Sequence, residues 1–287
     1  MYKQRKNPLM HPGNLGKSAV DHPPWTKTAI AAILELTFFA HNGIHAASAA
    51  RGDDAEDLLK EMAEYVLAQK TIQATYDTDV EIVTTELQKL SFGASGQVIL
   101  SRPNHFHAGR VGGYAIVELI FDGKTLTILG KNLNAYAQLE SPGTLEQLVE
   151  RIRGGCTGSL PGVDLLLTRS YEDLTDGITD AKHVGRGIIG DIECEHLAFR
   201  TNDADWQLWV QTGRHPIPRK YIITNKNVAA SPQYAIHFKD WRTDVTAGES
   251  TFIFSPPPDA RKVDLTNPAE ADEILARIAA RLRRHWS

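Results

Sequence analysis

A strict alternation of residues between positions 72 and 82 is the strongest constraint that this sequence places on its fold. One set of alternate positions holds Ile72, Ala74, Tyr76, Thr78, Val80 and Ile82. The other set holds Gln73, Thr75, Asp77, Asp79 and Glu81. A repeat of two residues sends side chains to opposite faces of a strand. We therefore predict a strand with one buried face and one solvated face, the pattern of an antiparallel sheet covered on one side.

Further strands are predicted at short spacing on both sides of a central break. The first group covers 97–102, 106–110, 114–121, 125–129 and 135–139. Asp122-Gly123 separates two of these strands and is typical of a hairpin turn. The second group covers 192–199, 206–210, 221–224, 234–238 and 251–254. Strands this close together favour antiparallel meanders over parallel β-α-β units.

Helical periodicity appears in three places. A helix is predicted over 54–69, where apolar residues recur at helical spacing. Two short helices are predicted between 143 and 180, the second over 160–174. A last helix is predicted over 269–286. The expected class is α+β, with an antiparallel sheet that curves around short helices to bury its apolar face.

The first 50 residues have the layout of a secretory signal peptide. Basic residues precede an apolar run over 28–40, and small residues follow at 46–50. Glu35 interrupts the run, so an N-terminal amphipathic helix is the alternative. We predict a signal peptide over 1–50, a domain over 51–265, and a C-terminal amphipathic helix over 266–287. A secreted, periplasmic location follows from this interpretation.

Charge and cysteine content narrow the class of partner. Cleavage after the small residues would remove five basic and two acidic residues from a chain whose net charge is already −4. An acidic mature chain lacks the basic footprint of a nucleic-acid binder. Cys156 and Cys194 are the two cysteines. An oxidising compartment permits a disulfide between them, and two buried free thiols are the alternative.

Several motifs, in consistent order, resemble the LolA lipoprotein carriers. Residues 101–104 read Ser-Arg-Pro-Asn at a strand end, and residues 121–126 read Phe-Asp-Gly-Lys-Thr-Leu at a hairpin. A tryptophan hairpin at 206–209 precedes Pro-Arg-Lys-Tyr at 218–221, and 252–258 reads Phe-Ile-Phe-Ser-Pro-Pro-Pro. The chain also resembles an uncharacterised family of predicted periplasmic proteins. The resemblance implies a strongly curved, incomplete antiparallel β-barrel with a lid of short helices over an apolar concavity.

The resemblance also implies a role for Arg102. In LolA carriers the arginine of this motif reaches into the cavity and binds lid carbonyl groups, whereas a strand-end arginine in solvent is the alternative. Aromatic residues in or beside the predicted strands would line the cavity if they point inward, and ordinary core packing is the alternative for each. The candidate ligand-binding residues are Arg102, Tyr76, Phe106, Tyr114, Phe121, Trp206 and Tyr234.

No motif gives this chain a catalytic, cofactor or metal site. Residues 185–190 match Gly-x-Gly-x-x-Gly, but a strand is predicted after them where the dinucleotide fingerprint requires a helix. His105 and His107 share a strand face, as do Cys194 and His196, yet further ligands at metal-site spacing are missing from the sequence. We predict that the protein is not an enzyme and uses no cofactor.

These features lead to one preferred function and one alternative. The preferred hypothesis is a periplasmic, non-catalytic carrier or binder of a lipidic or other apolar ligand, held in a lidded half-barrel. The alternative is a periplasmic sensor or scaffold that binds a protein partner. The basic residues of the predicted C-terminal helix would allow at most peripheral membrane contact, and an ordinary solvated helix end is the other interpretation of them.

Overall fold

The computed structural model describes residues 53–113, 115–153 and 162–264. The predicted signal peptide, the predicted C-terminal helix, Tyr114 and Cys156 lie outside these residues. Within them, strands greatly outnumber helices, as the α+β class predicts.

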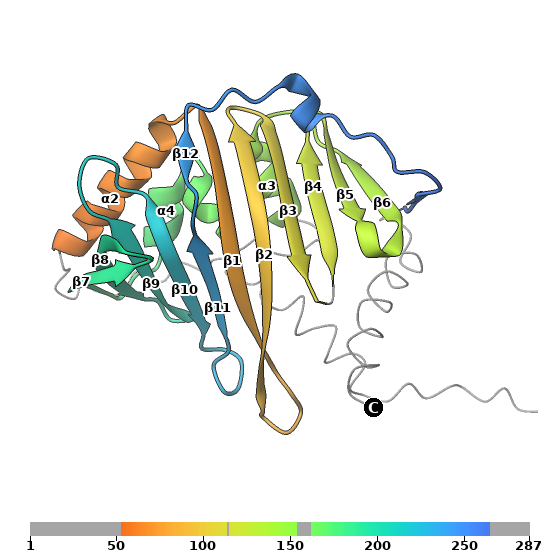
Figure 1. The fold of residues 1–287 in the computed structure, drawn as a ribbon. Helices are drawn as coiled ribbons and strands as arrows, with labels where there is room; N and C mark the ends of the chain where they lie inside the picture. The colour runs from red at the N-terminus through yellow and green to blue at the C-terminus, as the bar shows by residue number, and fades with distance from the viewer. Residues whose placement is uncertain (1–52, 114, 154–161, 265–287) are drawn as a thin grey trace, which may run out of the picture.

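One sheet of thirteen strands dominates the structure (Figure 1). Its order is β13-β6-β5-β4-β3-β2-β1-β11-β10-β9-β8-β7, and β12 pairs with β1 off this path. The strands are β1 (Thr71–Val83), β2 (Lys89–Ser101), β3 (His105–Gly112), β4 (Ile116–Phe121), β5 (Thr125–Gly130), β6 (Ala135–Glu140), β7 (Asp180–Ile189), β8 (Ile192–Arg200), β9 (Ala204–Gln211), β10 (Pro218–Asn225), β11 (Gln233–Phe238), β12 (Arg242–Thr243) and β13 (Arg261–Lys262).

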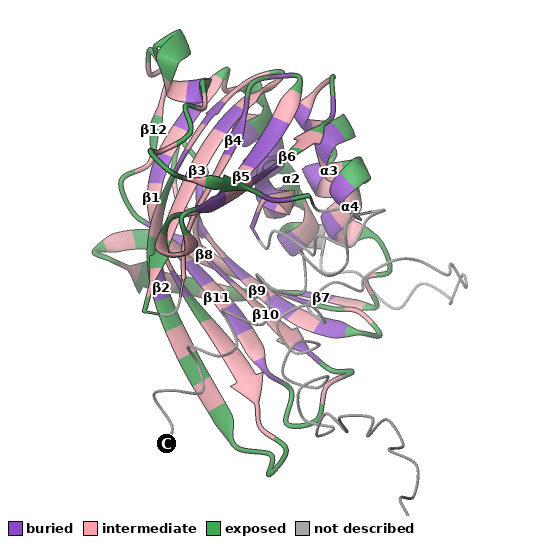
Figure 2. Cartoon of the chain, turned by 90° about the vertical axis from the view of Figure 1, so that its right-hand side faces the viewer, coloured by how far each residue is buried: buried purple, intermediate pink, exposed green. Residues whose placement is uncertain are grey.

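Two antiparallel meanders make up this sheet. Strands β1 to β6 form the first and β7 to β11 the second, and β11 returns to pair with β1, Phe238 opposite Tyr76. Among the described strands, only β13 and β6 pair in parallel. The sheet curls, and β13 and β7 end the strand order without pairing with each other. Figure 2 shows β6 and β7 on opposite sides of the opening. The predicted incomplete barrel is therefore confirmed.

Helices cover the inner face of the curled sheet. They are α2 (Asp53–Ala68), α3 (Leu145–Arg153) and α4 (Ser170–Thr175), together with the 3-10 turn η3 (Asp164–Leu166). Two other 3-10 turns lie elsewhere: η2 (Lys131–Leu133) joins β5 to β6, and η4 (Glu249–Phe252) follows β12 and contacts β3. Helix α2 packs against β7, β8 and β9 and buries Leu59, Met62 and Val66 completely or almost so. We call the side of the sheet that faces these helices the inner face, and α3, η3 and α4 together the lid.

Cross-strand register shows which side chains share the inner face. Ile72 faces Leu100, which faces Phe106, and the row continues through Phe121 to Leu126. None of these five is more than 8% exposed. The apolar set of the alternation in β1 thus points into the core, as predicted, because directly opposed residues of antiparallel strands lie on the same face.

Two sequence-based assignments are wrong. Residues 160–174 do not form one helix, because Leu167 adopts an extended backbone between η3 and α4 within the part that the structure describes. Leu165, Leu166 and Leu167 are all buried. Three consecutive residues cannot share one face of a regular helix, so the backbone must break to bury them. The strand predicted over 251–254 is instead the end of η4 and an extended segment.

That segment belongs to a C-terminal strap, residues 244–263, which crosses the outer face of the first meander (Figure 1). The Phe252 ring lies 5.1 Å from the His105 ring, and the Phe254 ring lies 5.0 Å from that of Tyr136. Phe252 and Phe254 of the strap therefore pack on the outer face of the sheet and do not form backbone hydrogen bonds with its strands. The strap explains why Ile120 and Leu129 are buried although they lie on the outer face.

Candidate functional site

Arg102, directly after β2, connects the sheet to α2 and to the lid. Its Nη2 donates a hydrogen bond of 2.8 Å to the carbonyl oxygen of Leu166 in η3. Its Nε donates to the carbonyl oxygen of Gln69 at 3.1 Å, and Nη2 also lies 3.5 Å from that of Val66. The side chain is 14% exposed. Arg102 therefore points inward and binds a lid carbonyl group, the contact that the resemblance implies.

Glu146 of α3 completes the contact between Arg102 and the lid. Its Oε1 lies 4.0 Å from Nη1 of Arg102 and accepts a hydrogen bond from the Thr168 hydroxyl. Burial raises the pKa of Glu146, but the hydrogen bonds that it accepts outweigh burial and lower the pKa overall. Burial lowers the pKa of Arg102, and the negative charge of Glu146 partly opposes this decrease. We call Arg102, Glu146, Thr168 and the Leu166 carbonyl the latch.

A second contact ties the lid to the other meander. The Tyr221 hydroxyl of β10 donates to Asp164 of η3 at 3.4 Å. Burial, together with the Asp164 carboxylate, raises the pKa of Tyr221 well above its usual value. Gly162, at the start of this lid segment, lies close to Ile236 of β11. The lid thus contacts both halves of the sheet.

The predicted aromatic residues that the structure describes lie on the inner face, but they differ in how much of them is accessible. Phe106, Phe121, Trp206 and Tyr234 are at most 8% exposed and belong to the hydrophobic core. Trp206 stacks on Phe199 at 4.0 Å and contacts Tyr221 edge-on. Tyr76 is only partly buried. Tyr114 lies outside the described residues.

Beyond the rows that the helices cover, the inner face continues as a half-buried apolar surface. Ala108 of β3 faces Leu119 of β4, which faces Ile128 of β5, and all three are partly buried. Val117 lies opposite Arg110 in the next row. We call Ala108, Val117, Leu119 and Ile128 the inner strip. Sequence reasoning did not select these residues or Arg110, although positions 106, 108 and 110 alternate onto one face of their strand.

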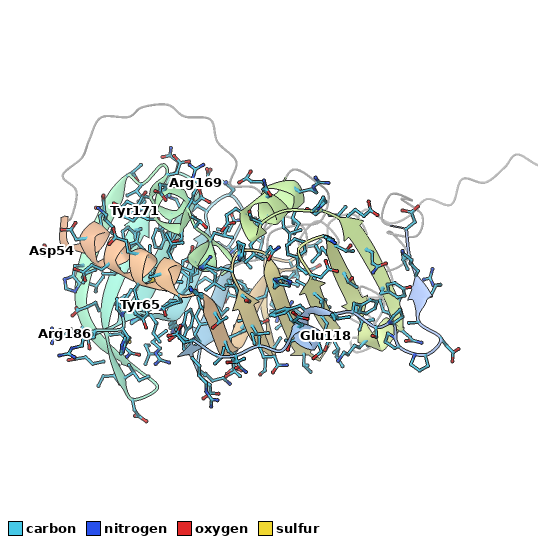
Figure 3. All side chains as sticks on the ribbon, turned by 90° about the horizontal axis from the view of Figure 1, so that it is seen from above. Asp54, Tyr65, Glu118, Arg169, Tyr171 and Arg186 are labelled. Carbon is cyan, nitrogen blue, oxygen red and sulfur yellow. The ribbon has the colours of Figure 1, made fainter. Side chains whose placement is uncertain are left out.

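The histidine pair that the sequence singled out lies on the outer face. His107 bonds through Nδ1 to the carbonyl oxygen of Thr251, and its Nε2 is 4.0 Å from Glu118. Glu118 also pairs with Lys131, and it lies beside the strap in Figure 3. These side chains line a groove of about 670 Å³ together with Ile253 and other residues of the strap.

Ligands for a metal do not gather in the described chain. Among residues 53–113, 115–153 and 162–264, no group of three or more His, Cys, Asp or Glu side chains could hold an ion. Cys194 is a buried free thiol. The glycine motif at 185–190 lies in β7 and the turn after it, and β8 follows where a dinucleotide site needs a helix. In the same part of the chain, no helix combines the length and the hydropathy of a membrane span.

Solved structures with a similar overall path of the chain come from several bacteria. An uncharacterised conserved protein of Thermus thermophilus is 11% identical, with a TM-score of 0.44 over 73% of this chain and 98% of its own. LprF of Mycobacterium bovis is 12% identical, with a TM-score of 0.41 over 69% and 97%. The MucA/MucB complex of Pseudomonas aeruginosa contains a chain 16% identical, with a TM-score of 0.39 over 70% and 61%.

Sequence comparison identifies the family. Curated proteins gave no match to the sequence. Residues 55–266 match the family described as "Predicted periplasmic protein (DUF2092)", a range that includes the sheet, the lid and the strap. The chain therefore belongs to the DUF2092 family of predicted periplasmic proteins.

Proposed function

We propose that this protein is a non-catalytic periplasmic carrier or binder of an apolar ligand, which the inner face holds beside the lid. The observation that supports this proposal is the inner strip, a half-buried apolar surface continuous with the core. A protein that leaves part of such a concave surface uncovered loses stability unless a ligand covers it. Burial of alkyl groups there would supply about 0.8 kcal/mol per CH₂.

The latch gives this binding a means of reversal. Its hydrogen bonds involve a charged guanidinium, and bonds of this kind contribute about 1.5–3 kcal/mol each. They join the lid to the end of β2 through a few atoms only. Separating Arg102 from Leu166 and Glu146 would free this side of the lid without unfolding the sheet. Arg102 therefore acts in the proposal by holding the lid in place, not by touching the ligand.

The experiment for this proposal is native mass spectrometry of the protein recovered from periplasm, followed by solvent extraction and lipid analysis. The proposal predicts a co-purifying acyl-containing species that is reduced in Arg102→Leu, because the lid of that variant loses its bond to the sheet. Arg200→Gln, which removes an exposed outer-face arginine paired with Asp205, is the control and should retain the species. A clean apo mass for the natural chain, with no uptake of added fatty acids, would refute the carrier proposal.

A second candidate function is the binding of a protein partner. Strand β7 ends the strand order of the sheet, and its Val184 and Ile188 are 56% and 73% exposed. An edge strand with exposed apolar residues can accept an added strand from another chain. A ligand-free mass in the experiment above, together with a stable fold, would favour this candidate.

A further inference from the structure

Within the described chain, the inner faces of strands β1 to β6 and β9 to β11 carry one charged side chain, Arg110 of β3. The register places Arg110 between Gly96 and Val117 in a cross-strand row. All other inner-face positions of these described strands hold apolar or aromatic residues, glycine, proline, threonine or asparagine. Arg110 is therefore the one cation that the inner faces of these described strands present beside apolar side chains.

The neighbours of Arg110 form a polar corner on this apolar face. The Tyr76 side chain crosses Gly96, and its hydroxyl donates to the carbonyl oxygen of Gly109 at 3.2 Å. Burial raises the pKa of Tyr76, and the charge of Arg110 partly opposes that rise, so the two groups are within electrostatic range. Arg110 itself is only partly buried.

The inner strip begins directly beside this corner. Val117 lies opposite Arg110, and Ala108 precedes Arg110 by two residues on the same face. From Ala108 the row continues through Leu119 to Ile128, across three neighbouring strands and about 10 Å. A positive group therefore lies at one side of an apolar surface.

We propose that the ligand of the inner face is an amphiphile with an anionic head group, a carboxylate or a phosphate ester. The head group pairs with Arg110 while the alkyl chain covers Ala108, Leu119 and Ile128. A guanidinium presents a planar set of donors that matches both oxyanions, and low local polarity strengthens the pairing. This inference rests on the proposed function, and it names the chemical class of the ligand.

Titration calorimetry with four amphiphiles that share a sixteen-carbon chain tests this inference. The probes are palmitate, hexadecyl phosphate, hexadecanol and hexadecyltrimethylammonium. We expect the natural chain to bind the two anionic probes more tightly than the alcohol and the cation. Arg110→Gln should weaken anionic binding about tenfold or more, the value of a charge-assisted hydrogen bond, and leave hexadecanol binding unchanged. Arg110→Lys should retain part of the preference, and Arg200→Gln, on the outer face, should retain all of it.

The outcomes separate this inference from the proposed function. Two results would overturn the inference that the ligand has an anionic head group: equal binding of palmitate by the natural chain and by Arg110→Gln, or equal binding of palmitate and hexadecanol by the natural chain. Either result would leave the carrier proposal standing. Binding of none of the four probes by folded protein would overturn both. Binding of acetate or inorganic phosphate as tightly as of palmitate or hexadecyl phosphate would reveal an ion site to which the alkyl chain contributes nothing, and would overturn the amphiphile. If Arg110→Gln does not fold, the head-group comparison in the natural chain and in Arg110→Lys decides.

Discussion

A single glycine allows the inner face to hold Tyr76 as it does. A Cβ atom built on Gly96 would lie 2.4 Å from Cζ of Tyr76 and 2.5 Å from the Gly109 carbonyl oxygen. Both distances are far below van der Waals contact, so any larger residue must push the ring away from the sheet. Gly96 therefore positions the Tyr76 hydroxyl, and with it the corner that contains Arg110.

We expect Gly96→Ala to lower the free energy of unfolding by about 1–3 kcal/mol, the usual cost of overpacking. Gly109→Ala is the matched control on the adjacent strand, where a Cβ would meet its nearest atoms, in Glu118 and Gln97, at 3.8 and 4.0 Å. That control should be neutral, or stabilising by up to about 1 kcal/mol, because alanine restricts the unfolded chain. Urea unfolding measures both. Equal destabilisation by the two substitutions would contradict the packing described at Gly96.

At the scale of the elements, the Glu146 carboxylate helps to hold the lid, and the direction of its pKa shift predicts how the stability of the lid depends on pH. The folded-state pKa of Glu146 lies below its usual value of 4.5. Its ionised form therefore contributes stability above that value, and the contribution is lost as the pH falls through the folded-state pKa. Acidification should weaken the latch before it affects the apolar core.

Glu146→Gln tests this pH dependence. The variant should unfold at lower urea concentration than the natural chain at pH 7, and the difference between the two should shrink as the pH falls below the usual carboxyl value of 4.5 and through the lowered folded-state pKa of Glu146. Glu172→Gln, an exposed position on α4, should follow the natural chain at every pH. A difference between Glu146→Gln and the natural chain that stays constant over this range would show that Glu146 ionisation does not hold the lid.

The elements also show how far the sequence predicts the fold. Strand β1 was predictable because its two faces meet different environments along 13 residues. Strand β7 was missed because Gly185, Gly187 and a bulge after His183 interrupt the alternation in a strand at the end of the sheet. The strap was mistaken for a strand because Phe252 and Phe254 alternate like strand residues, although they pack on the outer face of the sheet.

The site was less predictable than the fold, for a physical reason. Arg102 could be singled out through the Arg-Pro-Asn motif. Arg110 stands in the same predicted strand face as Phe106, yet helices cover Phe106 and leave Arg110 partly accessible. Which rows of a sheet the helices cover depends on contacts between distant parts of the chain, and local periodicity carries no information about them.

At the scale of the whole molecule, the helices among the described residues are short compared with the sheet. Twelve strands side by side extend about 50 Å along the arc of the sheet, at about 4.8 Å per strand. Helix α2 has 16 residues and α3 has nine, which correspond to about 24 and 14 Å. These described helices therefore close the core under β7 to β11 and under one end of β1 to β6, and the residues of the inner strip are only partly buried.

Photoaffinity labelling would locate the ligand most directly. A palmitate analogue with a diazirine near the end of its chain is bound to the natural protein, irradiated, and its attachment sites are mapped by peptide mass spectrometry. Binding on the inner face predicts labelled peptides from β3 to β5, residues 105–130, which carry the inner strip, and loss of that labelling when excess unmodified palmitate competes. Labelling confined to the strap at 244–263, or to β7, would contradict binding on the inner face.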